Sequence, residues 1–262
     1  MHSLYVEKYI KDADSPWLVF LHGFGGSTKM WKKQLDAFRE HYNLLLLDLP
    51  GHGQSRVGIA QLGAQRFEDV ADLVVQTLIR HKILRASFVC ASVGTLVFAA
   101  IQQKYPAMVT GAVLCGAVAG VSRAMRLALA FLDRTKGIFP YTVLLNMFAH
   151  LLLPLASHEK SRKFFIESGK LLGRTEFMAW FSLAVRDLDV LKNIPNTMRN
   201  VIFISGTEDF TFLRGVKKTF GRMKGVRLTL LHHCGHVCSL QRPREFNALS
   251  LEFLDQSIPA LI

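Results

Sequence analysis

The segment that most constrains the fold is Cys90-Ala91-Ser92-Val93-Gly94. It follows the apolar run Ala86–Val89, which predicts a short buried strand, and it precedes Thr95–Gln103, which predicts a helix. A serine in so tight a turn needs strained backbone angles and small neighbours, and a glycine two residues later is typical of a nucleophile elbow. Cys90 stands where that motif usually has its first glycine, so a chance match in a buried strand–helix turn is the alternative.

Three further motifs lie where other apolar, β-rich runs end. Leu21–Ser27 closes the predicted strand Trp17–Leu21, Gly206–Asp209 closes Val201–Ser205, and Gly235–Val237 closes Arg227–His232. The carboxyl ends of parallel strands share one edge of an open sheet, where ligands bind. We therefore expect the serine, the acid and the histidine of these motifs to meet at that edge, in the chain order Ser92, Asp209, His236.

These motifs, together with Asp-Leu-Pro-Gly-His-Gly-Gln-Ser at Asp48–Ser55, resemble those of the small, capped α/β-hydrolases. The chain is similar to bacterial carboxylesterases, pimeloyl-carrier-protein methyl ester esterases and menaquinone-pathway lyase-like enzymes, over nearly all of its length outside about 119–194. The resemblance implies an α/β fold with a mostly parallel, doubly wound sheet and a helical cap inserted after the sixth strand. It also implies hydrolysis of a carboxylic ester.

The rhythm of the sequence divides the chain into a core and an insertion. Strand-like runs alternate with helical patterns in residues 1–118 and 195–262, which predicts the parallel sheet of a single core domain. Between 119 and 194 only helical patterns occur, and we assign this segment to the cap. Its abundant Phe and Leu suit a substrate with an apolar acyl chain or ring. The predicted cap helices are Ala124–Leu132, Thr142–Leu153, His158–Leu172 and Thr175–Leu188.

The proposed catalytic group is a triad. Ser92 is the nucleophile, which needs a base to remove its proton at neutral pH. His236 is that base and then the acid for the leaving group, and Asp209 holds its imidazole in the required tautomer. Glu208 is the backup acid. The segment after the strand at 109–114 offers no carboxylate, which favours Asp209.

The remaining site residues belong to loops and to the cap. The backbone N–H groups of Phe24 and Val93 are expected to form the oxyanion hole. His22 supports the loop that carries Phe24 by hydrogen bonding. We assign five residues to substrate binding: His22, Gly23, Phe139, Phe148 and Phe181.

Other chemistries fit the sequence less well. The run His232–Cys238 invites a zinc site, but structural zinc sites usually draw ligand pairs from two separate segments, so we expect no metal and no other cofactor. The four cysteines do not resemble a disulfide framework, which is consistent with a reducing compartment. Cys90 as the nucleophile is disfavoured because it lies in the strand before the turn. No amino-terminal signal or membrane-spanning run is evident, and a cytoplasmic location is expected.

The net charge of +12 is spread along the chain as +3 in residues 1–118, +5 in 119–195 and +4 in 196–262. The densest run, Lys217–Arg227, has five cations and no acid. A solvated helix face explains it, while attraction to an acidic carrier protein, a CoA-type acyl ester or an anionic membrane surface is the sharper alternative. Contact with a membrane is not predicted, and nucleic acid is excluded because no nucleic-acid motif accompanies the charge.

Three functions remain open on this evidence. The leading one is a serine hydrolase that cleaves a small-molecule ester or thioester with an apolar acyl group through an acyl-serine intermediate. A C–C hydrolase or lyase on the same scaffold shares the triad, and Arg123, Arg126 or Lys136 at the mouth of the cap would then meet an anionic substrate. A ligand-binding or signalling protein with little turnover is the third.

Overall fold

A single twisted sheet forms the centre of the molecule. The computed structural model describes residues 3–188, 191 and 200–257. In these residues seven strands form one sheet in the order β1-β3-β2-β4-β5-β6-β7, with β1 antiparallel to β3 and the other pairs parallel. The strands are β1 (Val6–Tyr9), β2 (Trp17–Leu21), β3 (Asn43–Leu47), β4 (Ala86–Ala91), β5 (Val109–Cys115), β6 (Val201–Gly206) and β7 (Val226–Leu231).

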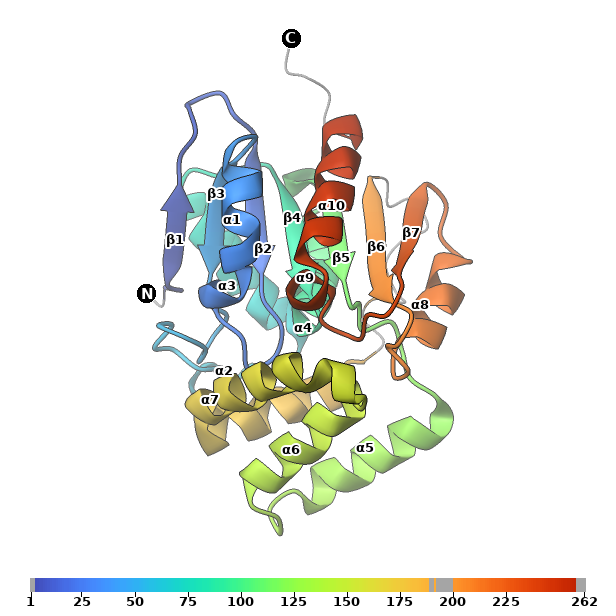
Figure 1. Cartoon of the computed structure of the whole chain (residues 1–262). Coiled ribbons are helices and arrows are strands. Elements are labelled where there is room, and N and C mark those ends of the chain that lie inside the picture. The colour runs from blue at the N-terminus through green and yellow to red at the C-terminus, as the bar shows by residue number, and fades with distance from the viewer. Residues whose placement is uncertain (1–2, 189–190, 192–199, 258–262) are drawn as a thin grey trace.

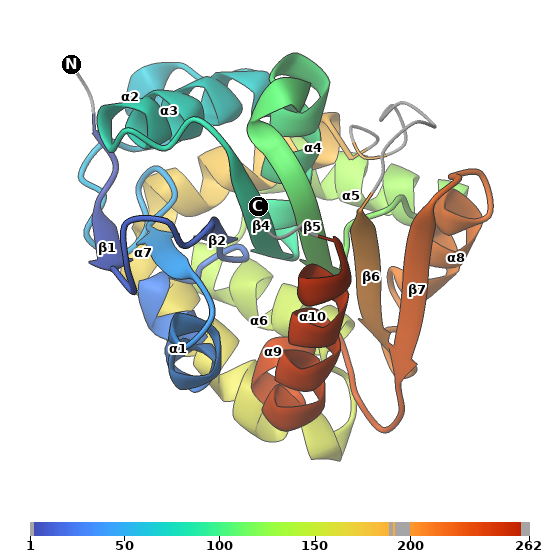
Figure 2. The same ribbon diagram turned by 90° about the horizontal axis from the view of Figure 1, so that it is seen from above.

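The sheet is covered by helices on both faces (Figure 2). Its central strands β3 and β4 are buried along their whole length, as expected of parallel strands packed on two sides. One face packs against α3, α4 and α8, and the other against α1, α9 and α10. The core helices are α1 (Lys32–Arg39), α2 (Ile59–Leu62), α3 (Phe67–Arg80), α4 (Val93–Lys104), α8 (Leu213–Phe220), α9 (Cys238–Gln241) and α10 (Pro243–Ser257). The predicted doubly wound α/β fold is confirmed.

A helical insertion separates β5 from β6. It contains α5 (Arg123–Thr135), α6 (Tyr141–Leu152) and α7 (Glu159–Arg186), and α7 is interrupted at Gly173, which has φ +77°. Figure 1 shows these three helices lying across the edge of the sheet at which the parallel strands end. The insertion follows the fifth of the seven strands in the described residues. The predicted domain boundary at 194/195 falls outside the described residues.

Several polar contacts hold the insertion against the core. The indole N–H of Trp180 donates to the Pro50 carbonyl (3.0 Å). The Glu176 carboxylate accepts the Ile59 amide (2.9 Å) at the start of α2, where it satisfies a helix N–H that has no partner within the helix. His158 Nε2 and Glu208 Oε2 are 2.8 Å apart. These contacts attach the insertion to the loops at the carboxyl ends of the parallel strands.

None of the described helices combines the length and the apolar character needed to cross a membrane.

Candidate active site

The turn after β4 has the geometry expected of a nucleophile elbow. Ser92 has φ +48° and ψ −119°, which is a strained conformation for a residue with a side chain. Its amide donates to the Cys115 carbonyl (3.0 Å), and its own carbonyl accepts the Thr95 hydroxyl (2.6 Å). Helix α4 begins at Val93, immediately after the serine. The strain is thus held by hydrogen bonds on both sides, and the hydroxyl is presented beyond the end of the strand.

The packing around Ser92 explains why small residues stand next to it. A Cβ atom on Gly94 would lie 2.4 Å from the Leu21 carbonyl oxygen, so only glycine lets α4 approach β2 so closely. Cys90, in place of the usual first glycine, pairs with Leu21 and Leu114 inside the sheet and is fully buried. Burial raises the pKa of the Cys90 thiol well above its ordinary value, which keeps it protonated and a poor nucleophile.

Ser92, His236 and Asp209 form a hydrogen-bonded chain. The Ser92 hydroxyl lies 2.8 Å from His236 Nε2 and donates to it. On the other side of the ring, Nδ1–H donates to Asp209 Oδ2 (2.8 Å). The second carboxylate oxygen of Asp209 accepts the Phe212 amide (3.0 Å). These three side chains come from turns after β4, β6 and β7, so the sheet brings them together across 144 positions of sequence.

The surroundings of His236 set its protonation. Burial of the ring opposes the charged form, but the Asp209 carboxylate and its hydrogen bond outweigh burial, so the pKa of His236 is raised above its ordinary value. An imidazole in this position is a stronger base toward the Ser92 hydroxyl. Asp209 itself is fully buried, and its hydrogen bonds to His236 and Phe212 satisfy both of its oxygens.

Two backbone amides lie near Ser92: that of Phe24 in the loop after β2, and that of Val93 at the start of α4. A Cβ atom on Gly23 would be 3.2 Å from Ser92 Cβ, so the loop lies directly against the serine. Among the described residues, no protein acceptor receives the N–H of Phe24 or of Val93. Unpaired amides at such a point can stabilise an oxyanion.

Two buried histidines brace this loop. His22 Nδ1–H donates to the Gly23 carbonyl (2.8 Å), and Nε2 accepts the Leu49 amide (2.9 Å). His52 Nδ1–H donates to the Pro50 carbonyl (3.0 Å), and Nε2 accepts the Gly25 amide (3.0 Å). Burial lowers the pKa of both imidazoles below the ordinary value, so each ring stays neutral with one donor and one acceptor. The role of His52 was not anticipated from the sequence.

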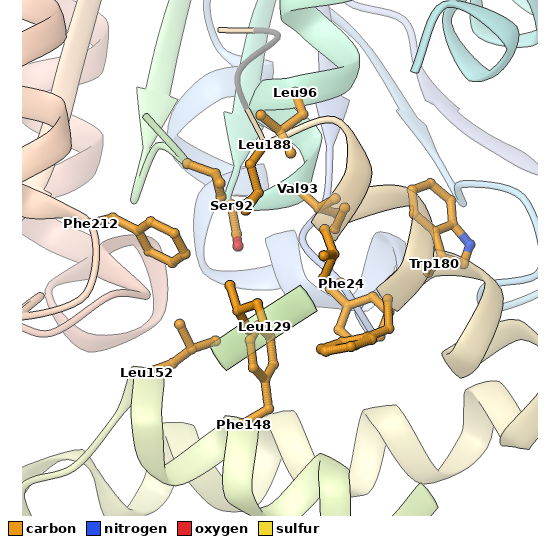
Figure 3. A pocket seen from close by; sticks show the side chains of 14 residues that line it. Phe24, Ser92, Val93, Leu96, Leu129, Phe148, Leu152, Trp180, Leu188 and Phe212 are labelled. Atoms are coloured by element: carbon orange, nitrogen blue, oxygen red, sulfur yellow. The ribbon is translucent and has the colours of Figure 1, made fainter. Parts of the chain in front are cut away.

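Ser92 opens into two small cavities beneath the insertion. The first, of about 50 Å³, is almost wholly apolar, and Figure 3 shows the Ser92 hydroxyl directed into it. The second, of about 30 Å³, lies on the side of His236 and the glycines of the loop. Both are far smaller than the roughly 300–1,000 Å³ of typical ligand sites. Prominent residues around the first are Phe24, Leu129, Phe148, Leu152, Phe181 and Phe212.

The predicted substrate-binding residues separate into two groups. Phe148 and Phe181 line the first cavity, and Gly23 lines the second. Phe139 is 42% exposed in the loop between α5 and α6 and lines neither cavity, because that loop is at the far end of the hairpin from Ser92. His22 lies behind the loop and also lines neither. Neither Phe139 nor His22 therefore lines the space at Ser92, and their assignment to substrate binding stays a prediction.

The cations expected at the mouth of the cap do not reach these cavities. Arg123 lines a separate groove. Lys136 forms hydrogen bonds with Asp133 and Ser182. Among the described residues, the walls of both cavities contain no Lys, Arg, Asp or Glu. The space above Ser92 thus suits an uncharged group.

Three buried cysteines lie behind His236. The Cys238 thiol donates to the carbonyls of Ile204 (3.8 Å) and Gly235 (3.6 Å). Interaction between the neighbouring thiols lowers the pKa of Cys115 and raises that of Cys238. In the part of the chain that the structure describes, no group of three or more His, Cys, Asp or Glu side chains is arranged to hold a metal ion. The cluster packs beneath the triad.

The sequence is similar to a known family and to named enzymes. A family model described as alpha/beta hydrolase family matches residues 18–249. The 2-succinyl-6-hydroxy-2,4-cyclohexadiene-1-carboxylate synthase of Escherichia coli O1:K1 / APEC is 38% identical over 109 residues, which cover 42% of this chain and 41% of that protein. The match therefore spans about two fifths of this curated relative.

Solved structures share the fold over nearly the whole chain. A hydrolase from Pseudomonas aeruginosa PA01 has a TM-score of 0.80 at 21% identity and covers 96% of this chain and 94% of its own. The enol-lactonase from Burkholderia xenovorans LB400 has a TM-score of 0.75 at 22% identity, covering 96% of each chain. MenH from S. aureus has a TM-score of 0.73 at 18% identity, covering 96% and 98%. At such identities the likeness concerns the fold.

Proposed function

The chain belongs to the alpha/beta hydrolase family, and we propose that it is a serine hydrolase acting on an uncharged carboxylic ester or thioester with a compact apolar acyl group. The observation that carries this proposal is the hydrogen-bonded chain from Ser92 through His236 to Asp209, which ends in an apolar cavity. Such a chain activates a hydroxyl for attack on a carbonyl carbon.

The reaction follows from the geometry in two halves. In the first half, His236 Nε2 takes the Ser92 proton as Oγ attacks the carbonyl carbon. The resulting oxyanion accepts hydrogen bonds from the backbone N–H groups of Phe24 and Val93. His236 then protonates the leaving alcohol or thiol as its bond to the acyl carbon breaks. In the second half, water gives its proton to His236 as its oxygen attacks the acyl-Ser92 carbonyl carbon. The bond between that carbon and Ser92 Oγ then breaks, His236 returns the proton to Oγ, and the carboxylic acid is released.

The two parts of the substrate, its acyl group and its leaving group, bind in different cavities. His236 lines the second cavity and not the first, so the leaving group that it protonates belongs in the second. The acyl group then occupies the first, among Phe148, Phe181 and Leu129. Because about 50 Å³ holds only a few carbon atoms, longer acyl chains need the insertion or its phenylalanines to move.

A fluorophosphonate probe and a series of p-nitrophenyl esters test the proposal. We expect the probe to add one adduct to the intact mass, located on Ser92, and Ser92→Ala to abolish it. We also expect turnover of p-nitrophenyl acetate and butyrate to exceed that of the octanoate ester. A folded protein with neither adduct nor turnover contradicts the proposal and favours ligand binding without catalysis.

A second candidate is C–C bond chemistry on the same triad. It is favoured by the sequence match to the E. coli synthase, whose name specifies a carboxylate product. An anionic product calls for a cation nearby, and the described walls of both cavities have none. Labelling of Ser92 without hydrolysis of any simple ester would support this candidate over the ester hydrolase.

A further inference from the structure

The outer face of the insertion exposes an unusual number of large apolar side chains. Nine of the thirteen exposed large apolar residues in the described part of the chain lie in the insertion. Six of them line the α5–loop–α6 hairpin, with exposures of 42% to 76%, and we call them the outer hairpin face: Leu127, Phe131, Ile138, Phe139, Val143 and Met147. Exposed apolar patches of this kind mark sites of interaction.

The outer hairpin face is distinct from the surface that lines the active site. On α5, Leu129 faces the cavity at Ser92, whereas Leu127, two residues and about 200° away around the helix, is 72% exposed. On α6, Phe148 faces the cavity and Val143 lies on the opposite side. The hairpin is therefore apolar on both sides, and only one side is covered by protein.

A basic groove adjoins this face. It has a volume of about 760 Å³, lies between α8 and the amino-terminal end of α5, and is lined by Arg123, Arg214, Lys218 and Arg222 without any Asp or Glu among the described lining residues. Arg214 and Lys218 are four residues apart on α8, where like charges destabilise a helix unless an anion lies between them. The cationic lining of this groove suits an anionic ligand.

The apolar face and the groove are continuous. His150, near the end of α6, lines the groove and also the hollow beside Val143 and Met147. Figure 1 shows α5 and α6 at the edge of the molecule farthest from the sheet, with α8 above the end of α5 where the groove lies. One partner can therefore contact both regions at once.

We propose that this surface docks onto an anionic phospholipid membrane, with the outer hairpin face entering the interface and the groove receiving lipid phosphates. Large apolar side chains bordered by Arg and Lys are the composition of interfacial membrane-binding segments. Association with a second copy through the same face would bring the cations of both copies together, and like charges across an interface oppose it. The proposal does not depend on the activity of Ser92.

Sedimentation of the full chain with vesicles tests the docking. We expect binding to phosphatidylcholine vesicles that contain phosphatidylglycerol, weaker binding to phosphatidylcholine alone, and weakening of both the binding and this preference at high salt. The double variant Phe131→Ser/Ile138→Ser should bind at least about tenfold more weakly. The matched control is Leu84→Ser, because Leu84 is a leucine of the core domain, outside the insertion, and is 68% exposed. This variant should bind like the parent.

A second pair of variants tests the groove. Arg214→Glu/Lys218→Glu should weaken binding to anionic vesicles by about fivefold or more per cation and reduce its salt dependence. Lys29→Glu, at an exposed cation of the core, should change it little. Thermal melting and probe labelling of Ser92 confirm that each variant is folded.

Three results would overturn the docking proposal. One is equal binding, or none, to the two kinds of vesicle. Another is a dimer in sedimentation velocity that the hairpin variant abolishes, which would assign the face to a second copy. The third is binding of inorganic pyrophosphate in the groove without vesicle binding, which would assign the groove to a free phosphate compound.

Discussion

The core and the insertion are held in place by different kinds of contact. In the core, each side chain of the triad follows a strand whose neighbours are fixed by register, as in the pairs Ala91 with Cys115 and Gly206 with Leu231. In the insertion, packing of phenylalanines and a few polar contacts set the position of the helices. Loop and insertion meet through aromatic rings, including Phe24 with Phe177 (5.1 Å between centroids).

This difference implies that the core controls the catalytic step and that the insertion controls which substrates bind. The strand ends place the side chains of the triad within hydrogen-bond distance of one another. The insertion sets the size and polarity of the space above Ser92, and side-chain packing can be altered there without moving the triad. Substitutions in the core should therefore change the rate, and substitutions in the insertion should change which substrates react.

The largest expected effect is that of Ser92→Ala. Loss of the nucleophile should lower kcat by about 10⁴–10⁶-fold, since a triad without its serine retains only the help of oxyanion hole and binding. The fold should persist, because the amide of residue 92 still donates to Cys115. Steady-state kinetics and a thermal melt measure the two, and residual activity above a hundredth of the parent would contradict the role of Ser92.

Asp209→Asn is expected to reduce kcat by about 10⁴-fold through loss of the correct His236 tautomer. The parent should gain activity as pH rises through the pKa of His236, because only the neutral ring accepts the Ser92 proton, and the midpoint should lie above the ordinary value of about 6.5. In the variant, the Asp209 carboxylate no longer raises the pKa of His236, while burial still lowers it. The midpoint should therefore move to lower pH. A profile of kcat/KM against pH that does not move would contradict this assignment.

His158→Ala tests the contact between the insertion and the core. His158 is buried, packs against Gly235 and bonds to Glu208, next to Asp209. Its loss should cost about 1–3 kcal/mol of local stability, speed amide exchange in α6 and α7, and raise KM more than it lowers kcat. Glu208→Gln, which keeps a hydrogen-bond acceptor for His158, should do less. Unchanged exchange in the insertion would show that packing alone holds it.

Phe148→Ala is expected to have the smallest effect on overall rate. Removing a ring from the first cavity should shift the preference among p-nitrophenyl esters by about tenfold toward longer acyl chains. Phe139→Ala, at the exposed loop, is the control and should leave the preference unchanged. A uniform loss over all chain lengths would argue that Phe148 supports the fold and does not shape the acyl site.

The sequence predicted where the strands of the core and the helices of the insertion lie along the chain, but not which residues of the insertion face Ser92, and the reason is physical. Apolar runs such as Leu44–Leu47 can be satisfied only inside a sheet, and turn motifs at their ends leave little freedom. The elbow helix was expected from Thr95 and begins at Val93, and the short helix α9 was missed because four residues give no periodicity. In the insertion, Phe139 and Phe148 look alike in sequence, and only helix packing decides which one faces Ser92.

Contacts between distant segments were the least predictable part of the site. The residues that neighbour His52 and His158 in the sequence are compatible with many roles for each histidine. Their positions against Gly25 and Gly235 arise only when the loops are brought together. Glu176 likewise gives no sign in the sequence that it binds the start of α2.

The sequence by itself determined the order of strands and helices and the chain order of serine, acid and histidine, because hydrophobic periodicity and tight-turn chemistry are local properties. The tertiary structure alone decided the distances within the triad, the apolar and uncharged character of the space above Ser92, and the exposure of the outer hairpin face. Those features depend on which surfaces of separate elements pack together, and packing is a property of the whole chain.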